Sequence, residues 1–313
     1  MIEASDEGHV LVIGSAGVDI VGRPIHALQT GTSNPGMLRM SDGGVARNVA
    51  ENLARLGLDV VLITAIGDDR SGQRLLEQAI DVGINMEHSI VLEDQRTGAY
   101  LAVLDDHGNL HLGLDDMRTA SAITPVYLRA HKHLFTTAQA MFVDANLAPE
   151  TLQTAIRMAA RADVPIAADP TSITLAPRLS KHLDRLWLLT PNEAEAEALC
   201  PKPVLHANPT SAIDAARHLV SHGATHAIIT MAEFGLGYAT ASSSGHVPAI
   251  KTDIIDPTGA GDALTAAVMF ALLNEIPVDE AVRLGLAAAS LTLRRKGTVA
   301  PDLSLELLYN QLA

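Results

Sequence analysis

A chain of 313 residues, 48% of them hydrophobic, is long enough to bury the core of one large α/β domain or of two small ones. Its formal net charge of −14, with no basic stripe, argues against nucleic acid or an anionic membrane as the main partner. A single cysteine, Cys200, excludes an internal disulfide, and an acidic start without any apolar stretch near the ~20 residues of a membrane span leads us to expect a cytoplasmic protein.

The first 84 residues alternate between buried strands and amphipathic helices. Residues 9–17 and 59–67 are apolar runs that predict strands, whereas residues 45–57 and 71–84 have the helical period. The alternation returns later in the chain, at residues 140–146, 150–163, 164–170, 186–192, 211–223 and 226–231. This pattern predicts an α/β fold with a doubly wound, mostly parallel central sheet that helices cover on both faces.

Two segments depart from this alternation. Residues 18–40 have no helical period, and residues 97–117 carry a leucine at every second position from Leu110 to Leu114, which is typical of half-exposed antiparallel strands. We expect both segments to form a small β-sheet, a lid that projects from a single domain spanning residues 1–313.

The sequence DPTGAGDAL, residues 256–264, places two glycines and an acid directly before a long apolar helix. Gly259, Ala260 and Gly261 let the backbone approach a ligand with N–H groups free at a helix N-terminus, which is how anions are bound. Asp262 would repel a phosphate, but it can take the proton from a hydroxyl that attacks one. Two other interpretations stay open: a plain turn with an aspartate stabilised by the helix dipole, and a dinucleotide fingerprint without its third glycine.

A second glycine pair opens the helix at residues 45–57. Gly43 and Gly44 allow backbone N–H groups to touch a ligand, and the amide of Asn48 suits a sugar diol because it both donates and accepts hydrogen bonds. Asp19, just after the first strand, can accept two hydroxyl hydrogen bonds. The alternative for each is an ordinary loop with polar residues at a helix start.

The segment TPNEAEAEAL, residues 190–199, follows another predicted strand. Asn192 and Glu195 are three residues apart and can hold a hydrated Mg²⁺ near phosphates, although acid-rich helix starts are also common for purely structural reasons. His218 and His222 stand at a helix end, where we interpret them as partners of the helix dipole rather than as metal ligands.

All of these motifs follow predicted strands, at the sheet edge where α/β proteins bind ligands. In order and spacing they resemble the ribokinase family of carbohydrate kinases (PfkB type) over nearly the whole chain. GGVARNVAENLARLG (43–57) is similar to the first signature of that family and DPTGAGDAL to the second. TPNEAEAEAL and AAASLTLRRKGTVAP (287–301) are similar to its magnesium and nucleotide-side segments.

The resemblance implies an ATP-dependent kinase of a sugar or nucleoside that uses Mg²⁺, possesses a lid over its substrate and forms a homodimer through that lid. The implied roles are Asp262 as catalytic base, Gly259, Ala260 and Gly261 as anion hole, Asp19, Gly43, Gly44 and Asn48 as sugar ligands, Asn192 and Glu195 for Mg²⁺, Thr230, Gly235 and Thr258 with Asn192 and Gly261 on the nucleotide side, and Asp256 beside a K⁺ site.

Within the family, TSNPG (32–36) and LDDMRTASAIT (114–124) look most like pseudouridine kinases. On that resemblance we expect Ser33, Asn34 and Asp116 to pair with the base of pseudouridine, which would be phosphorylated at its 5′-hydroxyl. Ribose, another nucleoside or another sugar stays open as the substrate, and so does a non-catalytic sugar or nucleotide sensor.

Two positions depart from the family pattern. In TMAEFG, residues 230–235, Ala232 stands where the family has a glycine, and its methyl group either crowds the nucleotide or forces a different backbone angle. Gly17 stands where the family often has an asparagine two residues before Asp19, so one hydrogen bond to the sugar is expected to be missing.

Overall fold

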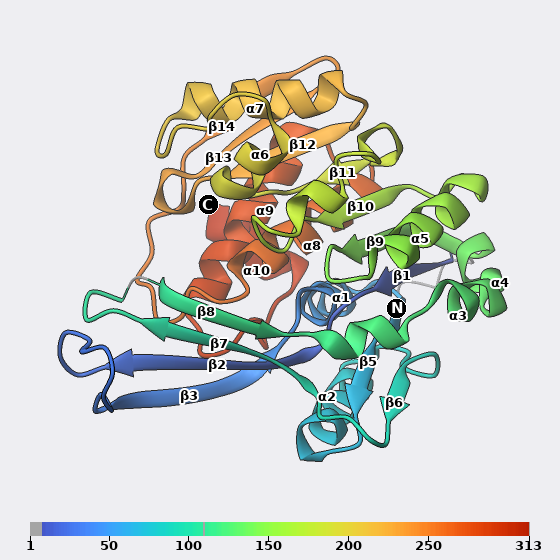
Figure 1. Ribbon diagram of the computed structural model, residues 1–313. Coiled ribbons are helices and arrows are strands. Elements are labelled where there is room, and N and C mark those ends of the chain that lie inside the picture. Colours follow the sequence, from blue (N-terminus) through green and yellow to red (C-terminus); the bar gives the residue numbers. More distant parts are fainter. Residues whose placement is uncertain (1–7, 109, 313) are drawn as a thin grey trace.

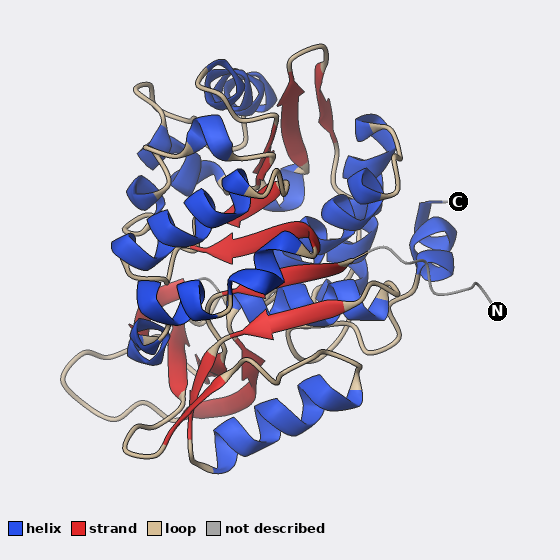
Figure 2. Ribbon diagram, turned by 90° about the vertical axis from the view of Figure 1, so that its right-hand side faces the viewer, coloured by secondary structure: helices blue, strands red, loops and turns tan. Residues whose placement is uncertain are grey.

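The computed structural model describes residues 8–108 and 110–312, arranged as shown in Figures 1 and 2. The acidic residues 1–7, which contributed to the expectation about the N-terminus, lie outside the described part. Within it, no helix has the length and apolar character needed to cross a bilayer.

The central sheet has eight strands in the order β14-β13-β12-β11-β10-β9-β1-β4. The pairs from β4 to β12 are all parallel, and β13 and β14 continue the sheet as antiparallel strands. The strands are β1 (His9–Ile13), β4 (Val60–Ile63), β9 (Ala138–Asp144), β10 (Ile166–Asp169), β11 (Leu188–Leu189), β12 (His226–Thr230), β13 (Leu236–Thr240) and β14 (Ser244–Val247). The predicted mostly parallel sheet is therefore confirmed.

Helices cover both faces of this sheet, as Figure 2 shows. In β1, Val10 and Val12 pack into one apolar cluster and Leu11 and Ile13 into another, because successive side chains of a strand point to opposite faces. The first face carries α1 (Val45–Arg55), α8 (Ala260–Leu273), α9 (Val278–Leu293) and α10 (Leu305–Leu312); the second carries α3 (Pro125–Ala130), α4 (Lys132–Thr136), α5 (Pro149–Arg161), α6 (Glu193–Leu199) and α7 (Pro209–Ser221).

The residues predicted as one strand at 59–67 form two. After β4 the chain leaves the central sheet at Thr64, and β5 (Ala65–Gly67) pairs with β6 (Ile90–Leu92) in a separate two-stranded sheet. Ile90 donates a hydrogen bond to the Thr64 carbonyl, 2.8 Å, which fixes this departure. Helix α2 (Arg70–Asp81) packs beside β5.

The two segments predicted as a lid form a separate four-stranded sheet in the order β3-β2-β7-β8, at the lower left of Figure 1. Its strands are β2 (Gly17–Pro24), β3 (Gly36–Gly43), β7 (Gly98–Leu104) and β8 (Leu110–Asp116). The first segment thus extends three residues beyond the predicted boundary at 40.

The two faces of the lid differ in chemistry. Asp19, Tyr100 and Asp115 are neighbours in the strand register, and all three line a cavity between the lid and the central sheet. The residues between them on the strands point the other way, and that outer face is aliphatic and largely exposed: Leu38, Met40, Leu112 and Leu114. The lid therefore offers polar groups to the cavity and apolar groups to the outside.

Candidate active site

A cavity of about 470 Å³ lies where the carboxyl ends of β1, β9 and β10 face the inner side of the lid. Of the residues predicted from the sequence, Asp19, Gly44, Asn48, Thr258 and Asp262 line it. Segments more than 200 residues apart in the chain therefore meet at one site.

Asp262 lies in the first turn of α8, directly after the turn that ends at Gly259. Gly259 has a φ of 80°, and a Cβ there would lie 1.9 Å from the carbonyl oxygen of Thr298, so only glycine fits. A Cβ on Gly261 would instead meet nothing within 4 Å beyond its chain neighbours and the backbone of its own helix. Because the first N–H groups of a helix have no carbonyl partner within it, this open space suits an anion.

A hydrogen bond joins the two signature motifs. Nδ2 of Asn48 donates to Oδ2 of Asp262 at 2.6 Å. The buried guanidinium of Arg47 donates to Oδ1 of Asn48, so the amide nitrogen is the atom that faces Asp262. Arg47 also donates to the Gly43 carbonyl at 3.2 Å and to Oγ1 of Thr298 at 2.6 Å. Arg47 is thus a positioning residue that the sequence did not single out.

Burial raises the pKa of all three carboxyl groups that line the cavity, those of Asp19, Asp115 and Asp262. Burial raises the pKa of Asp262 to about 7, and the charge of Asp19 adds to this while Asn48 and Arg47 oppose it. Burial also raises the pKa of Asp19 to about 6, against the opposing effect of Arg47. A carboxylate with a pKa near 7 is a stronger proton acceptor than an ordinary aspartate and is still available at physiological pH.

Asp144, at the end of β9, holds the floor of the cavity together. Its fully buried carboxylate accepts hydrogen bonds from the backbone N–H (2.8 Å) and the hydroxyl (2.6 Å) of Ser15 and from the N–H of Ala46 (3.2 Å). The side chain of Asn146 donates to the Ser15 hydroxyl at 3.0 Å. Ser15 and Asn146 both line the cavity, and none of these three residues was identified from the sequence.

Asn192 and Glu195, predicted for Mg²⁺, form a capping box at the start of α6. Oδ1 of Asn192 accepts from the N–H of Glu195 and Oε2 of Glu195 accepts from the N–H of Asn192, both at 2.9 Å. Burial, followed by the charges of Glu195 and Asp262, raises the pKa of Asp169 well above its usual value. The described residues contain no group of three metal-ligating side chains, so a divalent cation here would be held through water and phosphate oxygens. Buried, mutually repelling carboxylates fit such a cation.

Asp256, predicted beside a K⁺ site, is fully buried and paired with an arginine. Its carboxylate accepts from the N–H (3.1 Å) and the hydroxyl (2.8 Å) of Thr258 and from the N–H of Gly297 (3.1 Å). It also makes an ion pair with Arg39 of lid strand β3. Arg39 therefore supplies a positive charge where the resemblance implied a cation, and it ties the lid to the turn that precedes the anion site.

The predicted nucleotide-side residues lie farther along the same sheet edge. Asn192 follows β11 and forms a bridge with Thr230, the last residue of β12, and Gly235 precedes β13. Ala232, in place of the family's glycine, has a φ of 47°. The backbone thus keeps a left-handed conformation that strains an alanine.

At the substrate end, Gly43 lies against the Asp19 carboxylate and Gly17 leaves no room for a side chain. A Cβ on Gly17 would lie 2.6 Å from the Gly98 carbonyl oxygen and 2.8 Å from Cε of Met117. Met117 lines the cavity. An asparagine at position 17 is therefore sterically excluded here, and its hydrogen bond to a sugar is absent.

The structure does not bring the three predicted base-reading residues into the cavity. Ser33 and Asn34 lie exposed in the loop between β2 and β3, where the Asn34 side chain bonds the backbone of Gln29. Asp116 is exposed and pairs with Arg118 at 2.7 Å. Asp115 lines the cavity instead, because neighbouring residues of β8 face opposite sides of the lid.

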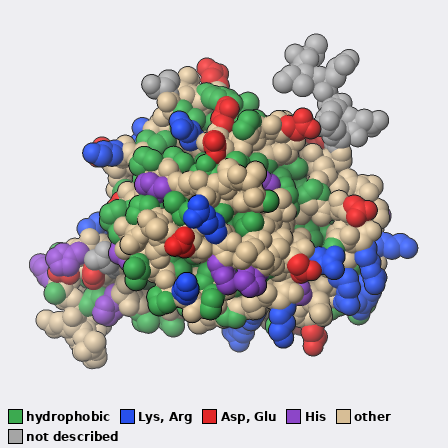
Figure 3. All heavy atoms as spheres, turned by 90° about the horizontal axis from the view of Figure 1, so that it is seen from above, with side chains coloured by type: hydrophobic (Ala, Val, Ile, Leu, Met, Phe, Trp, Pro, Cys, Tyr) green, Lys and Arg blue, Asp and Glu red, His purple; other side chains and the backbone are tan. Residues whose placement is uncertain are grey.

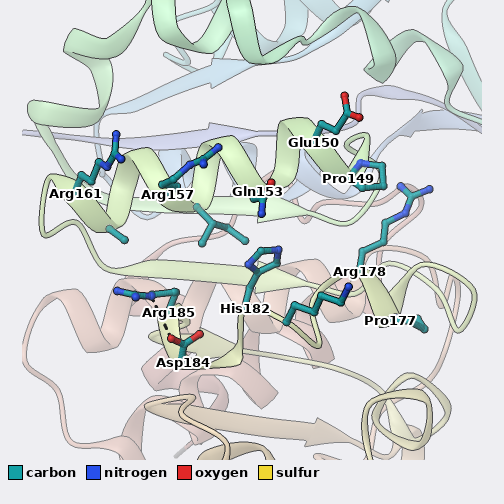
Figure 4. A pocket seen from close by; sticks show the side chains of 13 residues that line it. Pro149, Glu150, Gln153, Arg157, Arg161, Pro177, Arg178, His182, Asp184 and Arg185 are labelled. Carbon is teal, nitrogen blue, oxygen red and sulfur yellow. Dashed lines mark ion pairs between the residues drawn. The ribbon is translucent and has the colours of Figure 1, made fainter.

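A larger cavity, of about 860 Å³, lies between α5 and residues 176–185 and contains none of the predicted site residues (Figure 4). The smaller cavity under the lid is the candidate active site, since the two signature motifs and the buried carboxylates meet there.

Comparisons with known proteins agree with this site. The model of the pfkB family carbohydrate kinases matches residues 7–304. The chain is 33% identical to the pseudouridine kinase of Escherichia coli K12, over 96% of this chain and 95% of the relative. It is 30% identical to the guanosine-inosine kinase of Exiguobacterium acetylicum, over 90% and 93%.

The fold has the same relatives. The structure of the Arabidopsis thaliana ribokinase complexed with ribose and ATP superposes with a TM-score of 0.80, covering 98% of this chain and 99% of that one at 20% identity. The family match covers nearly the entire sequence, and the resemblance drawn from the motifs is confirmed. The chain therefore belongs to the pfkB family of carbohydrate kinases and is a sugar or nucleoside kinase.

Proposed function

We propose that the protein transfers the γ-phosphoryl group of ATP to the 5′-hydroxyl of pseudouridine, with Asp262 as the base. One observation carries the proposal: Asp262 stands beside the open N-terminus of α8, is bonded to Asn48, and shares a cavity with Asp19. A base, an anion site and a diol acceptor within one cavity are the groups that phosphoryl transfer to an alcohol requires.

The chain's own residues have distinct tasks in this reaction. Asp19 and Asn48 bind two ribose hydroxyls and direct the 5′-hydroxymethyl group toward Asp262. Asp262 accepts the hydroxyl proton as the oxygen attacks phosphorus. The N–H groups at residues 260–262 stabilise the negative charge of the transferred group, which they can do without reorganising. Arg47 keeps the amide of Asn48 in its orientation.

Mg²⁺, when bound with ATP, neutralises charge on the β- and γ-phosphates. Glu195 and Asp169, with Asn192, would hold it through water beside Asp262. Burial raises the pKa values of both Glu195 and Asp169, and the charge of Glu195 raises that of Asp169 further. These raised values support the assignment, because a cation nearby would compensate carboxylates that burial destabilises. Thr230 and Gly235, next along the edge, are proposed to flank the nucleotide.

The lid supplies the proposed base specificity. Pseudouridine has a free N1–H, which uridine lacks because its N1 carries the glycosidic bond. Asp115 and Tyr100 line the cavity from the lid and offer acceptors there, and we assign base recognition to them rather than to Ser33, Asn34 or Asp116. The relationship to the E. coli pseudouridine kinase supports the substrate. The relationship to the guanosine-inosine kinase supports a nucleoside more generally.

The test is kcat/KM on pseudouridine, uridine, guanosine, ribose and fructose, with ADP release as the signal. Pseudouridine should be the best of the five. Asp115→Asn should lower the preference for pseudouridine over uridine by at least about tenfold, whereas the matched control Asp116→Asn should leave it intact. A better substrate among the other four would replace the substrate assignment and keep the kinase. If none of the five causes ADP release, the result would favour a non-catalytic sensor.

A homodimer through the lid and a cytoplasmic location remain proposals. The aliphatic outer face of the lid supports the first, since contiguous exposed apolar surface marks protein contacts.

A further inference from the structure

The cavity of about 860 Å³ between α5 and residues 176–185 differs from the active site in charge. Five of its lining side chains are basic and two are acidic: Arg157, Arg161, Arg178, Lys181 and Arg185 against Glu150 and Asp184. The whole chain has only 22 Lys and Arg and a formal net charge of −14. Figure 3 shows basic side chains gathered at the right-hand edge of the molecule, the side on which α5 lies in Figure 1.

Most of this positive charge is not neutralised internally. Arg185 pairs with Asp184 at 3.2 Å. The side chains of Arg161 and Lys181 make no ion pair or hydrogen bond with any residue in the described ranges. Within the described part of the chain, the side chain of Arg157 has only a long contact of 3.5 Å, from Nη2 to the hydroxyl of Thr154.

The remaining lining suits a small molecule. Figure 4 shows Arg157 and Arg161 on α5 across from Arg185, with His182 pointing into the gap below Gln153. Burial lowers the pKa of His182, so its imidazole is neutral at physiological pH and can both donate and accept hydrogen bonds. Pro149, Ile156 and Ala160 add apolar surface for a ligand's carbon skeleton.

We propose that this cavity, the cationic groove, binds a small molecule that carries at least two phosphate charges. Arginine presents a planar fork of donors that matches phosphate oxygens, and several arginines around one cavity select multiply charged anions over a single carboxylate. The volume lies within the range of small-ligand sites, about 300–1,000 Å³.

Arg178 connects the groove to the active site. Its Nη1 donates to the carbonyl oxygens of Ala145 at 2.8 Å and Leu147 at 2.9 Å. Between these two residues lies Asn146, which lines the substrate cavity. The N–H of Ala145 bonds Oγ1 of Thr171 at 3.2 Å, and Thr171 lines that cavity as well. The groove and the active site thus hold the same loop from opposite sides.

This connection gives the groove a function. Nε and Nη2 of Arg178 remain for a phosphate while Nη1 keeps both carbonyls, so an anion in the groove immobilises the guanidinium and stiffens the loop at residues 145–147. The nucleoside then binds to a loop already in position, and its KM falls. Coupling of this kind typically changes affinity about 5- to 150-fold and acts equally in both directions.

Binding is measured first, by calorimetry with pyrophosphate and, separately, AMP, in the presence of a saturating non-hydrolysable ATP analogue that occupies the active-site anion hole. We expect one further site, weakened at least tenfold in Arg161→Ala/Lys181→Ala and unchanged in Arg129→Ala, an exposed arginine outside the groove. Tighter binding of AMP than of pyrophosphate would assign a nucleotide, and the reverse an inorganic phosphate. Equal affinity in the wild type and the double variant would overturn the site.

The coupling is measured next, as the nucleoside KM with and without saturating pyrophosphate. It should fall several-fold in the wild type and stay constant in the double variant. An unchanged wild-type KM would overturn the coupling. The binding arm needs no turnover, so it stands or falls independently of the proposed substrate. If the double variant lowers the melting temperature, Lys181→Ala alone replaces it.

Discussion

The apolar side chains of the central sheet are buried, whereas many of those on the lid sheet are exposed. Leu11 of β1 is 0% exposed, whereas Leu38 of β3 is 77% exposed. Both faces of the central sheet are buried by helices, and its polar groups gather at the carboxyl edge, where hydrogen bonds fix them. The lid has one polar face over the cavity and one aliphatic face without cover in the described residues. The main domain, which we call the body, thus holds Asp262 by its own contacts, whereas the outer face of the lid stays open to a second subunit, as in the proposed dimer.

The largest effect should come from the reacting group of the body. We expect Asp262→Asn to lower kcat by about 10²–10⁴-fold, because asparagine keeps the shape but cannot accept the hydroxyl proton. Initial rates at saturating nucleoside and ATP measure this. Retention of more than half of the activity would exclude Asp262 as the base.

The same substitution should make the protein more stable than the wild type, and this difference should grow as pH rises. A group whose pKa is about 7 in the folded state and 3.8 ordinarily stabilises the fold when protonated, so its contribution is lost as pH increases from about 4 to 7. The melting temperature of Asp262→Asn should exceed that of the wild type more at pH 8 than at pH 5.

The pH profile of the wild type tests the burial of that carboxyl group. Because Asp262 must be ionised to act, kcat/KM should fall about tenfold for each pH unit below its pKa of about 7 and level off above it. The profile is measured at constant ionic strength with a second coupling enzyme as control. A flat profile between pH 5 and 7 would contradict a raised pKa.

The link between body and lid should show a smaller effect. Arg39→Gln leaves the buried Asp256 carboxylate without its cation and loosens the turn before the anion site, which we expect to cost on the order of tenfold in kcat. The wild type should respond little to K⁺, Na⁺ or a bulky organic cation, since Arg39 already supplies the charge. The variant should regain activity in K⁺ over the organic cation at matched ionic strength. A strong K⁺ response of the wild type would show that Arg39 does not substitute for the ion.

The proposed role of the outer lid face as a dimer interface can be tested without an activity assay. Leu114→Glu places a charge on the aliphatic face, and in a symmetric dimer each such charge meets its own copy or its neighbours. Sedimentation should show the mass fall by about half, from dimer to monomer. Ile80→Glu is the matched control, because Ile80 on α2 and Leu114 are both 56% exposed. A monomeric wild type, or equal loss in both variants, would reject the lid as the interface.

The sequence predicted what depends on local chemistry. The glycine turns before α1 and α8, the alternating strands of the lid and the position of each motif after a strand all follow from short stretches of residues. It could not predict what depends on register. Asp115 and Asp116 are adjacent acids, and only the pairing of β8 with β7 decides which one faces the cavity.

Long-range burial was equally out of reach. Arg47 has the spacing of an exposed helical arginine, four residues from Glu51, yet it is buried because the end of β3 and Thr298, 251 residues away in sequence, close over it. Asp144 ends a buried strand, and its sequence context does not distinguish it from an ordinary acid before a turn. Asp144 can accept hydrogen bonds from Ser15 because β1 lies beside β9 in the central sheet and places Ser15 within reach.

The smallest effect should come from Ala232, where the sequence departs from its family and the backbone does not. Its φ of 47° strains an alanine by about 1–2 kcal/mol, and a glycine would relieve that strain. Glycine also loses more conformational entropy on folding, which offsets part of the gain, so Ala232→Gly should stabilise the protein by about 0–1 kcal/mol. Glu275 has a similar φ of 58° just after α8, and Glu275→Gly is the matched control for strain relief alone.

Both variants should gain stability in urea denaturation. Only Ala232→Gly should also lower the KM for ATP, because it removes a methyl group on the nucleotide side of the edge, and neither should change the KM for the nucleoside. A lower KM for ATP in both variants would mean that the effect comes from stability rather than from the space left by the methyl group. An unchanged KM for ATP in both variants would contradict the proposal that the nucleotide binds beside residues 230–235.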